Sequence, residues 1–150
     1  MNHFIKHSAP SSRVALNNYQ REHFCSLIEQ LVERALAQFE VRDTSDLPED
    51  GWESFTQTRE YLLFHTGAYA CGFVCADLRP NIDLDMVNRN PEAHVTSFDL
   101  KQLRHYAHTL MRVERANDGF GSAVWESMRS GALELLLRRL AHDGDLLEPL

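Results

Sequence analysis

Residues 24–39 read FCSLIEQLVERALAQF, and this stretch decides the fold class. Apolar side chains recur there at every third or fourth position, and polar side chains fill most positions between them. Because an α-helix turns once about every 3.6 residues, this recurrence places the apolar side chains on one face for about four turns. The stretch therefore predicts a long amphipathic helix, which we expect to begin between Ser12 and Asn18.

The last third of the chain predicts three further helices. Apolar side chains recur at helical spacing between Leu100 and Met111, and Gly119 suits the left-handed conformation that ends a helix. Residues 122–129 predict a short helix and residues 132–142 a final one, with Gly131 at the break between them. We expect both glycines to be structurally required, because a side chain is unfavourable at positive φ.

The acidic stretch 40–53 predicts a connection that leads into another helix, with Asp46 as its cap. We expect the buried face of that helix to consist of Trp52, Phe55, Leu62 and Leu63.

The middle of the chain is harder to assign. Residues 61–76 are the least polar stretch and predict either a central buried helix, bent near Gly67, or a buried strand. Prolines interrupt residues 77–96, which predict a long irregular connection with at most one short helix after Asp83.

The composition is that of a globular protein, with 150 residues, 43% of them hydrophobic and 25% charged. A chain of this length is expected to fold as a single domain over residues 1–150, and it can be stable without a metal or a disulfide. Residues 1–12 are polar, and we expect them to be flexible. The expected fold class is therefore all-α, a compact bundle of about five to six helices with a long irregular connection near residues 77–96.

Composition and charge exclude several classes of protein. No apolar run reaches the length of about 18 residues that a membrane span requires. The first residues lack an apolar signal region, and three cysteines are an odd number at low density, which favours a reducing, cytoplasmic location. The net charge of −7 argues against general binding of nucleic acid.

Motifs for phosphate loops, dinucleotides, zinc proteases and serine hydrolases do not occur in the sequence. We therefore expect no cofactor and assign no catalytic residue, which favours a protein that is not an enzyme. Asp83 and Asp85 could together bind a divalent cation, but two acids at this spacing are too common to define a site.

Several cysteines and histidines are candidate ligands for a soft metal. If residues 61–76 were helical, two cysteines would lie one turn apart and two histidines would be paired on a later helix, so that four ligands could close a zinc site. The cysteines lack the usual two-residue spacing, and buried thiols behave as small apolar side chains. We therefore interpret them as core residues and assign no metal site. The candidates are His65, Cys71, Cys75, His105 and His108.

A cationic stripe is the best candidate site in the sequence. On a helix over residues 100–116, five basic side chains fall within an arc of about 80°, beside the apolar face. Arginines in such a row can bind carboxylate or phosphate groups. The alternatives are a solvated face and a stripe paired internally with the acidic stretch 40–53. The members of the stripe are Lys101, Arg104, His108, Arg112 and Arg115.

Residues 100–140 also carry a recognisable pattern, in which an amphipathic helix is followed by Arg112-Val113-Glu114-Arg115, Gly119, Ser130-Gly131 and a short apolar helix ending in Arg139-Leu140. In this pattern they resemble an uncharacterised family of small bacterial proteins classed only as a domain of unknown function. The chain departs from the family at Ala116, where an aromatic residue is expected, and in lacking a central Asp-Trp pair. The resemblance implies a mainly helical cytoplasmic protein and no particular activity.

Two functional hypotheses follow. The first is a non-enzymatic interaction or regulatory protein that binds a protein partner or a second copy of itself. The second is a small anion-binding protein or enzyme that uses the cationic stripe on a phosphate-bearing or carboxylate-bearing ligand, with or without a metal at the Cys/His candidates. A concave pocket containing the stripe would favour the second hypothesis, and a flat stripe would favour the first.

Overall fold

The computed structural model describes residues 15–117 and 122–150, and within these ranges all regular elements are helices. The predicted all-α fold class is therefore confirmed. The described residues form eight α-helices rather than five to six, and three of the eight are short, with four to six residues each. The α-helices are α1 (Asn18–Phe39), α2 (Trp52–Phe55), α3 (Arg59–Ala70), α4 (Leu84–Arg89), α5 (Pro91–Val95), α6 (Leu100–Asn117), α7 (Ala123–Ser130) and α8 (Ala132–Asp143).

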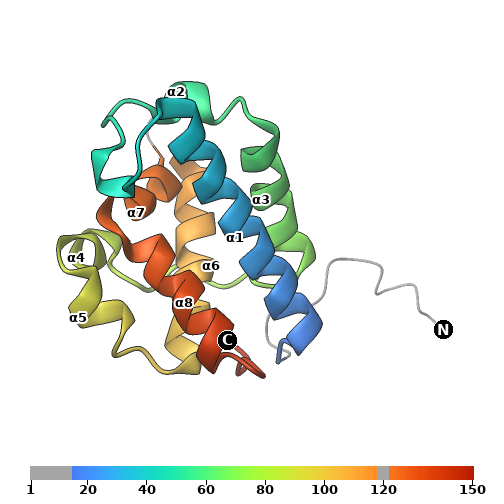
Figure 1. Cartoon of the computed structure of the whole chain (residues 1–150). Coiled ribbons are helices and arrows are strands. Elements are labelled where there is room, and N and C mark those ends of the chain that lie inside the picture. Colours follow the sequence, from blue (N-terminus) through green and yellow to red (C-terminus); the bar gives the residue numbers. More distant parts are fainter. Residues whose placement is uncertain (1–14, 118–121) are drawn as a thin grey trace.

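Helix α1 is the predicted amphipathic helix, and it packs against both α3 and α8 (Figure 1). Asn17 caps its first turn, since the side chains of Asn17 and Gln20 each bind the other's backbone N–H. Its buried face contains Phe24, Ile28 and Leu31, as the spacing predicted. The helix begins at the end of the range that we expected.

The apolar stretch 61–76 is neither the continuous helix nor the strand that its composition suggested. Helix α3 ends at Ala70, and residues 71–75 are buried in irregular backbone with a positive φ of 86° at Gly72. Side chains of α6 bind several carbonyl groups of this irregular backbone, so it can be buried without a regular hydrogen-bond ladder. We call residues 71–78 the buried loop, after its buried part 71–75; residues 76 and 77 are exposed.

The predicted buried face of the second helix is partly wrong. Thr58 caps a new helix, α3, which turns Phe64 and Ala68 inward, while Leu62 and Leu63 are exposed. The expected cap at Asp46 is also wrong, because Asp43 caps a 3₁₀ turn over Thr44–Asp46 instead. Helix α2 ends at Phe55 and α3 begins at Arg59, so residues 52–63 do not lie on one continuous helix and do not share one buried face.

Residues 77–96 hold two short helices, α4 and α5, where at most one was expected. Asp83 caps α4, while Asn90 caps α5 with Pro91 in its first turn, where proline costs no hydrogen bond.

The predicted break between the last two helices is present: Gly131 has a φ of 89° and joins α7 to α8. Gly119 and residues 1–12 lie outside the described residues.

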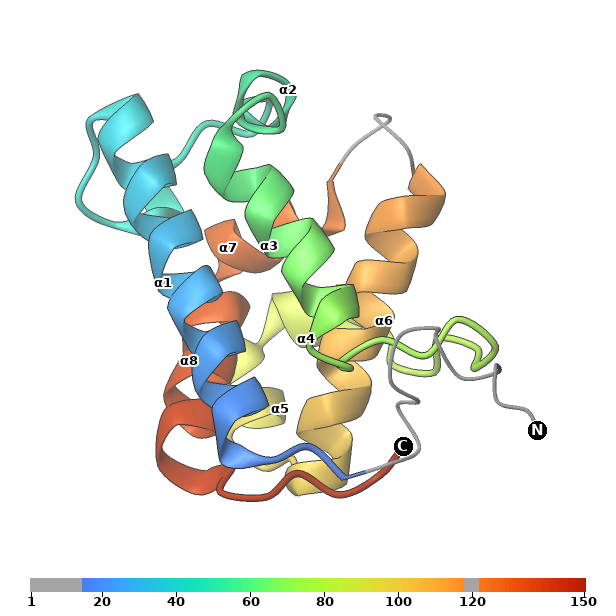
Figure 2. The same ribbon diagram turned by 90° about the vertical axis from the view of Figure 1, so that its right-hand side faces the viewer.

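Figure 2 shows the C-terminal segment crossing the end of the bundle where α1 begins. Leu16 and Leu147 form an isolated antiparallel bridge there, and the buried Arg21 donates to the carbonyl of Leu140 at 2.8 Å. None of the helices in the described ranges is long and apolar enough to cross a membrane.

Candidate functional site

Arg104, a member of the cationic stripe, is completely buried. Its guanidinium donates to the carbonyl of Gly72 at 2.8 Å and to the carbonyl of Glu148 at 3.1 Å. Burial lowers the pKa of Arg104 to about 10, which still leaves the side chain charged at neutral pH. A binding role in the stripe would require this arginine on the surface, whereas the buried side chain joins the buried loop to the C-terminal segment.

His108 is also buried, and the backbone occupies both of its ring nitrogens. Nδ1 accepts the N–H of Cys75 at 3.2 Å, so Nε2 carries the proton and donates to the carbonyl of Leu78 at 3.0 Å. Burial is the main cause that lowers the pKa of His108 below its ordinary value, which favours the neutral ring that this geometry requires.

The remaining stripe members divide into one partly buried arginine and two exposed side chains. Arg112 donates to carbonyls of the buried loop, at 3.1 Å to Cys75, at 3.3 Å to Leu78 and also to Ala76. Lys101 and Arg115 are exposed, and the guanidinium carbon of Arg115 lies 5.7 Å from the centre of the Tyr69 ring. The predicted stripe is therefore divided: its inner members hold the buried loop against α6.

The acidic stretch lies against a different part of the fold. Its end packs on α7, where Trp125 Nε1 donates to the carbonyl of Pro48 at 2.8 Å. Arg104, His108 and Arg112 instead make hydrogen bonds with the backbone of the buried loop, and Arg104 also with the C-terminal segment. The alternative prediction, in which this stretch covers the stripe, is wrong.

Among the candidate metal ligands, His108 contacts Cys75, but through the backbone N–H of Cys75 and not through its thiol. In the described part of the chain no group of three or more His, Cys, Asp or Glu side chains is placed to hold a metal ion. The thiol of Cys75 donates to the Asp77 carboxylate at 2.7 Å, and burial raises the pKa of the Cys71 thiol. His65 lies between the rings of Tyr61 and Tyr69 along α3, and His105 is half-buried on α6.

A cleft of about 830 Å³ lies elsewhere, between α4, α6 and α7, and we call it the α4–α6–α7 cleft. Aliphatic side chains supply much of its lining, and the remaining lining residues are polar or charged. Three of the charged side chains are acidic and one is basic. The apolar lining residues are Ile82, Leu84, Val113 and Ala123; the polar ones are Asn88, Asn117 and Ser122; the charged ones are Asp83, Asp85, Arg89 and Glu126.

The buried carboxylate of Glu114 fixes the wall between α6 and α7. Its oxygens accept the Ser122 hydroxyl at 2.9 Å, the N–H of Val124 at 3.0 Å and the Tyr61 hydroxyl. A carboxylate is favourable at the N-terminus of a helix, where backbone N–H groups lack helical partners. Glu114 therefore holds the start of α7 on α6, at the point where Ser122 lines the cleft.

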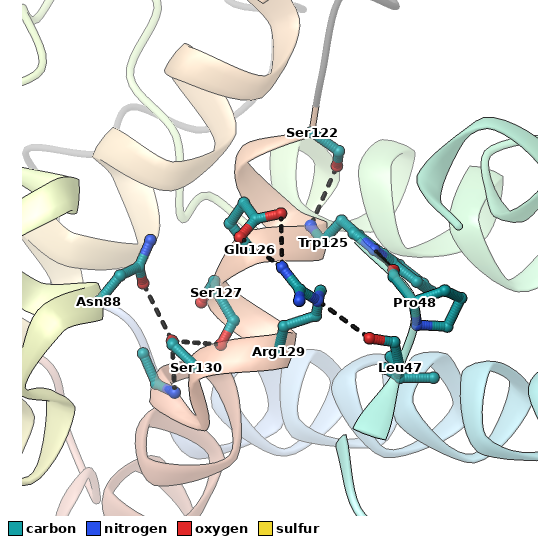
Figure 3. Close-up of polar contacts among 10 residues, drawn as sticks. Leu47, Pro48, Asn88, Ser122, Trp125, Glu126, Ser127, Arg129 and Ser130 are labelled. Atoms are coloured by element: carbon teal, nitrogen blue, oxygen red, sulfur yellow. Dashed lines mark hydrogen bonds and ion pairs between the residues drawn. The ribbon is translucent and has the colours of Figure 1, made fainter. Parts of the chain in front are cut away.

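Polar contacts also hold α7 against α4 and against the acidic stretch (Figure 3). Asn88 on α4 accepts the hydroxyl of Ser130 at 3.0 Å, which ties α4 to the end of α7. On α7, Glu126 pairs with Arg129 at 3.1 Å, and Arg129 Nε also donates to the carbonyl of Leu47 at 3.0 Å. The Glu126 side chain remains 48% exposed at the edge of the cleft.

Sequence reasoning missed the cleft and the role of Glu114. The only signal for the cleft was the pair Asp83 and Asp85, which both line it, although Asp83 also caps α4. A signal for Glu114 was present, because it follows Ala107, Leu110 and Met111 on the buried face of α6. An acidic side chain on an apolar face is a feature that needs a partner.

The comparisons with known proteins bring no further assignment. No protein-family model matches the chain, and no curated protein and no solved structure matches it either. The resemblance of residues 100–140 to a family of unknown function stays a prediction.

Proposed function

We propose that the protein is a non-enzymatic interaction module, and that the α4–α6–α7 cleft binds a segment of a partner protein. The observation that carries this proposal is the cleft itself, about 830 Å³ in volume with aliphatic walls and polar edges. Pockets that bind small molecules have similar volumes, about 300–1,000 Å³, with apolar walls and a few polar groups that set orientation. A peptide helix or extended segment that fills such a groove is a common mode of recognition.

The way in which the cleft is held supports this use. Glu114 fixes α7 on α6, and the hydrogen bond between Asn88 and Ser130 fixes α4 on α7. A site whose walls are held in place before binding loses less conformational entropy when the ligand arrives. The three walls therefore favour a preformed groove over a surface that must reorganise.

The contacts of the cationic stripe weigh against the anion-binding alternative. Arg104 and Arg112 use their guanidinium groups on backbone carbonyls, so fewer donors remain for a ligand. His108 has both ring nitrogens bound to the backbone, which removes it as a general base. The proposal includes a cytoplasmic location, which three free, buried cysteines support.

Site-specific photo-crosslinking tests the proposal. A photo-reactive amino acid replaces Ala123, which lines the cleft, and in a matched control it replaces the exposed Ala37 on α1. In the native host we expect a defined protein adduct from position 123 and none from position 37. A second change in the cleft, Val113→Arg, should remove the adduct by filling the groove with a charged side chain.

The outcomes separate three cases. No adduct from position 123, or the same adduct from both positions, would refute the proposed function. An adduct of twice the mass of this chain would identify the partner as a second copy of the protein. Thermal unfolding of the Val113→Arg variant, followed by circular dichroism, shows whether loss of the adduct reflects a blocked groove or an unfolded protein.

A further inference from the structure

The charged side chains of the α4–α6–α7 cleft are unequal in number. Three carboxylates, those of Asp83, Asp85 and Glu126, line the cleft with one guanidinium, that of Arg89, and a second guanidinium, that of Arg129, pairs with Glu126. At physiological ionic strength charges are screened over about 8 Å, and partly buried charges are screened less, so carboxylates that line one cleft act together on a group bound in it. Low-dielectric walls concentrate such a field. The cleft is therefore a place where positive charge is favoured.

The cleft has carboxylates at its edge and aliphatic side chains along its walls, and together these favour one kind of occupant. We propose that the cleft binds a basic segment of the partner, with at least one lysine or arginine at the edge and an aliphatic side chain against the walls. This inference rests on the proposed function and specifies the partner. The aliphatic walls at Leu84 and Val113 would bury the apolar anchor, and the carboxylates of Asp85 and Glu126 would bind the cation.

Glu126 is suited to this role although it already has a partner. Arg129 holds the Glu126 carboxylate at 3.1 Å and is itself held by the carbonyl of Leu47. A carboxylate has about four acceptor positions, so a second cation can bind without displacing Arg129. Because the side chain is about half exposed, a ligand can reach it without reorganising α7.

The net charge of −7 attracts basic peptides to many parts of the surface, so the test needs a control of equal charge. The chain offers one. Asp85→Asn with Glu126→Gln removes two carboxylates from the cleft, and Asp46→Asn with Glu49→Gln removes two exposed carboxylates from the acidic stretch. Both double variants change the net charge by the same amount and keep the shape of the side chains.

Fluorescence anisotropy with three labelled peptides of about twelve residues, about 18 Å long as helices, provides the measurement. The first has lysine and leucine at helical spacing, the second has glutamate in place of lysine, and the third has serine in place of leucine. At an ionic strength of about 0.15 M, we expect the cleft variant to bind the first peptide on the order of tenfold more weakly, and the control variant within about twofold of the unmodified protein. The second and third peptides should bind more weakly than the first.

Each contrary result overturns a defined part of the reasoning. No binding of the lysine–leucine peptide, equal weakening by both double variants, or tighter binding of the glutamate peptide would overturn the basic occupant. If the serine peptide bound as tightly as the lysine–leucine peptide, the interaction would be general charge attraction, and the proposed basic occupant with an aliphatic anchor would be overturned. The proposed function survives these results if position 123 still gives its adduct, and it fails on its own if that adduct is absent.

Discussion

Arg104 is the residue whose replacement tests the structure most directly, and we predict that Arg104→Met lowers the free energy of unfolding by about 3 kcal/mol. Its guanidinium makes hydrogen bonds of 2.8 Å to Gly72 and 3.1 Å to Glu148, both to backbone carbonyls. A hydrogen bond from a charged donor contributes about 1.5–3 kcal/mol, and the buried Gly72 carbonyl loses this donor in the variant. Removing a buried charge also relieves its desolvation cost, which offsets part of the loss.

Urea unfolding followed by circular dichroism measures the loss of unfolding free energy, and thermal unfolding followed in the same way measures the melting temperature. For a protein of this size, a loss of about 3 kcal/mol lowers the melting temperature by roughly 6–12 °C. The matched control is Arg115→Met, because that guanidinium is exposed and lies over the Tyr69 ring, a contact worth about 0.5–1 kcal/mol. If Arg104→Met loses no more stability than Arg115→Met, the buried contacts do not hold the fold.

Hydrogen exchange gives a second, local measure of the same substitution. Arg104 binds the buried loop at Gly72, so we expect the amides of residues 72–75 to exchange faster in the Arg104→Met variant. Amides at the centre of α1 should change only as far as global stability does. Uniform acceleration across the whole chain would contradict a local role for this arginine.

Three further predictions concern a turn, a buried carboxylate and a histidine. Gly131→Ala should cost on the order of 1–2 kcal/mol in urea unfolding, from backbone strain alone, because φ is 89° and a Cβ would meet nothing within 4 Å; an unchanged midpoint would contradict this. Glu114→Gln should cost about 1–3 kcal/mol, since an amide cannot accept from all the present donors, and heteronuclear NMR should show the change at Val124; no change at that amide would contradict the anchoring role. Burial lowers the pKa of His108 below 6.5 in the folded protein, so its neutral form contributes stability above that pH, and this contribution is lost as the pH falls through the lowered folded value. Urea midpoints should therefore fall as the pH falls below about 6.5, and less so in His108→Gln; equal pH dependence in the two proteins would show that other groups are responsible.

The sequence predicted correctly those elements whose structure depends on local pattern. Residues 24–39 have one apolar face and lie in α1, and residues 132–142 lie in α8 for the same reason. The break at Gly131 was also predictable, because glycine adopts positive φ without a steric penalty. These features follow from periodicity and backbone preference within a few turns, and no distant residue is needed to specify them.

The candidate site was less predictable, because periodicity tells which face of a helix a side chain occupies but not what covers that face. Arg104 and His108 were assigned correctly to one side of α6, yet the buried loop covers that side and takes their hydrogen bonds. The buried loop was not predictable from its apolar residues, because these residues are buried although their backbone forms neither a helix nor a strand. Every residue carries a backbone carbonyl, so a cation that binds carbonyls is not marked by any pattern of side chains in the sequence.

By itself, the sequence determined that the protein is helical, where its main amphipathic helices lie and where glycine breaks the final pair. Only the tertiary structure decided that the inner part of the stripe is structural, and that α4, α6 and α7 enclose a cleft with three carboxylates. The physical reason is the distance along the sequence over which each interaction acts. Helical periodicity and capping act between residues up to about four positions apart. Burial, hydrogen-bond partners and the charge of a cleft depend on segments such as 82–89, 113–117 and 122–126, which come together only when the core forms.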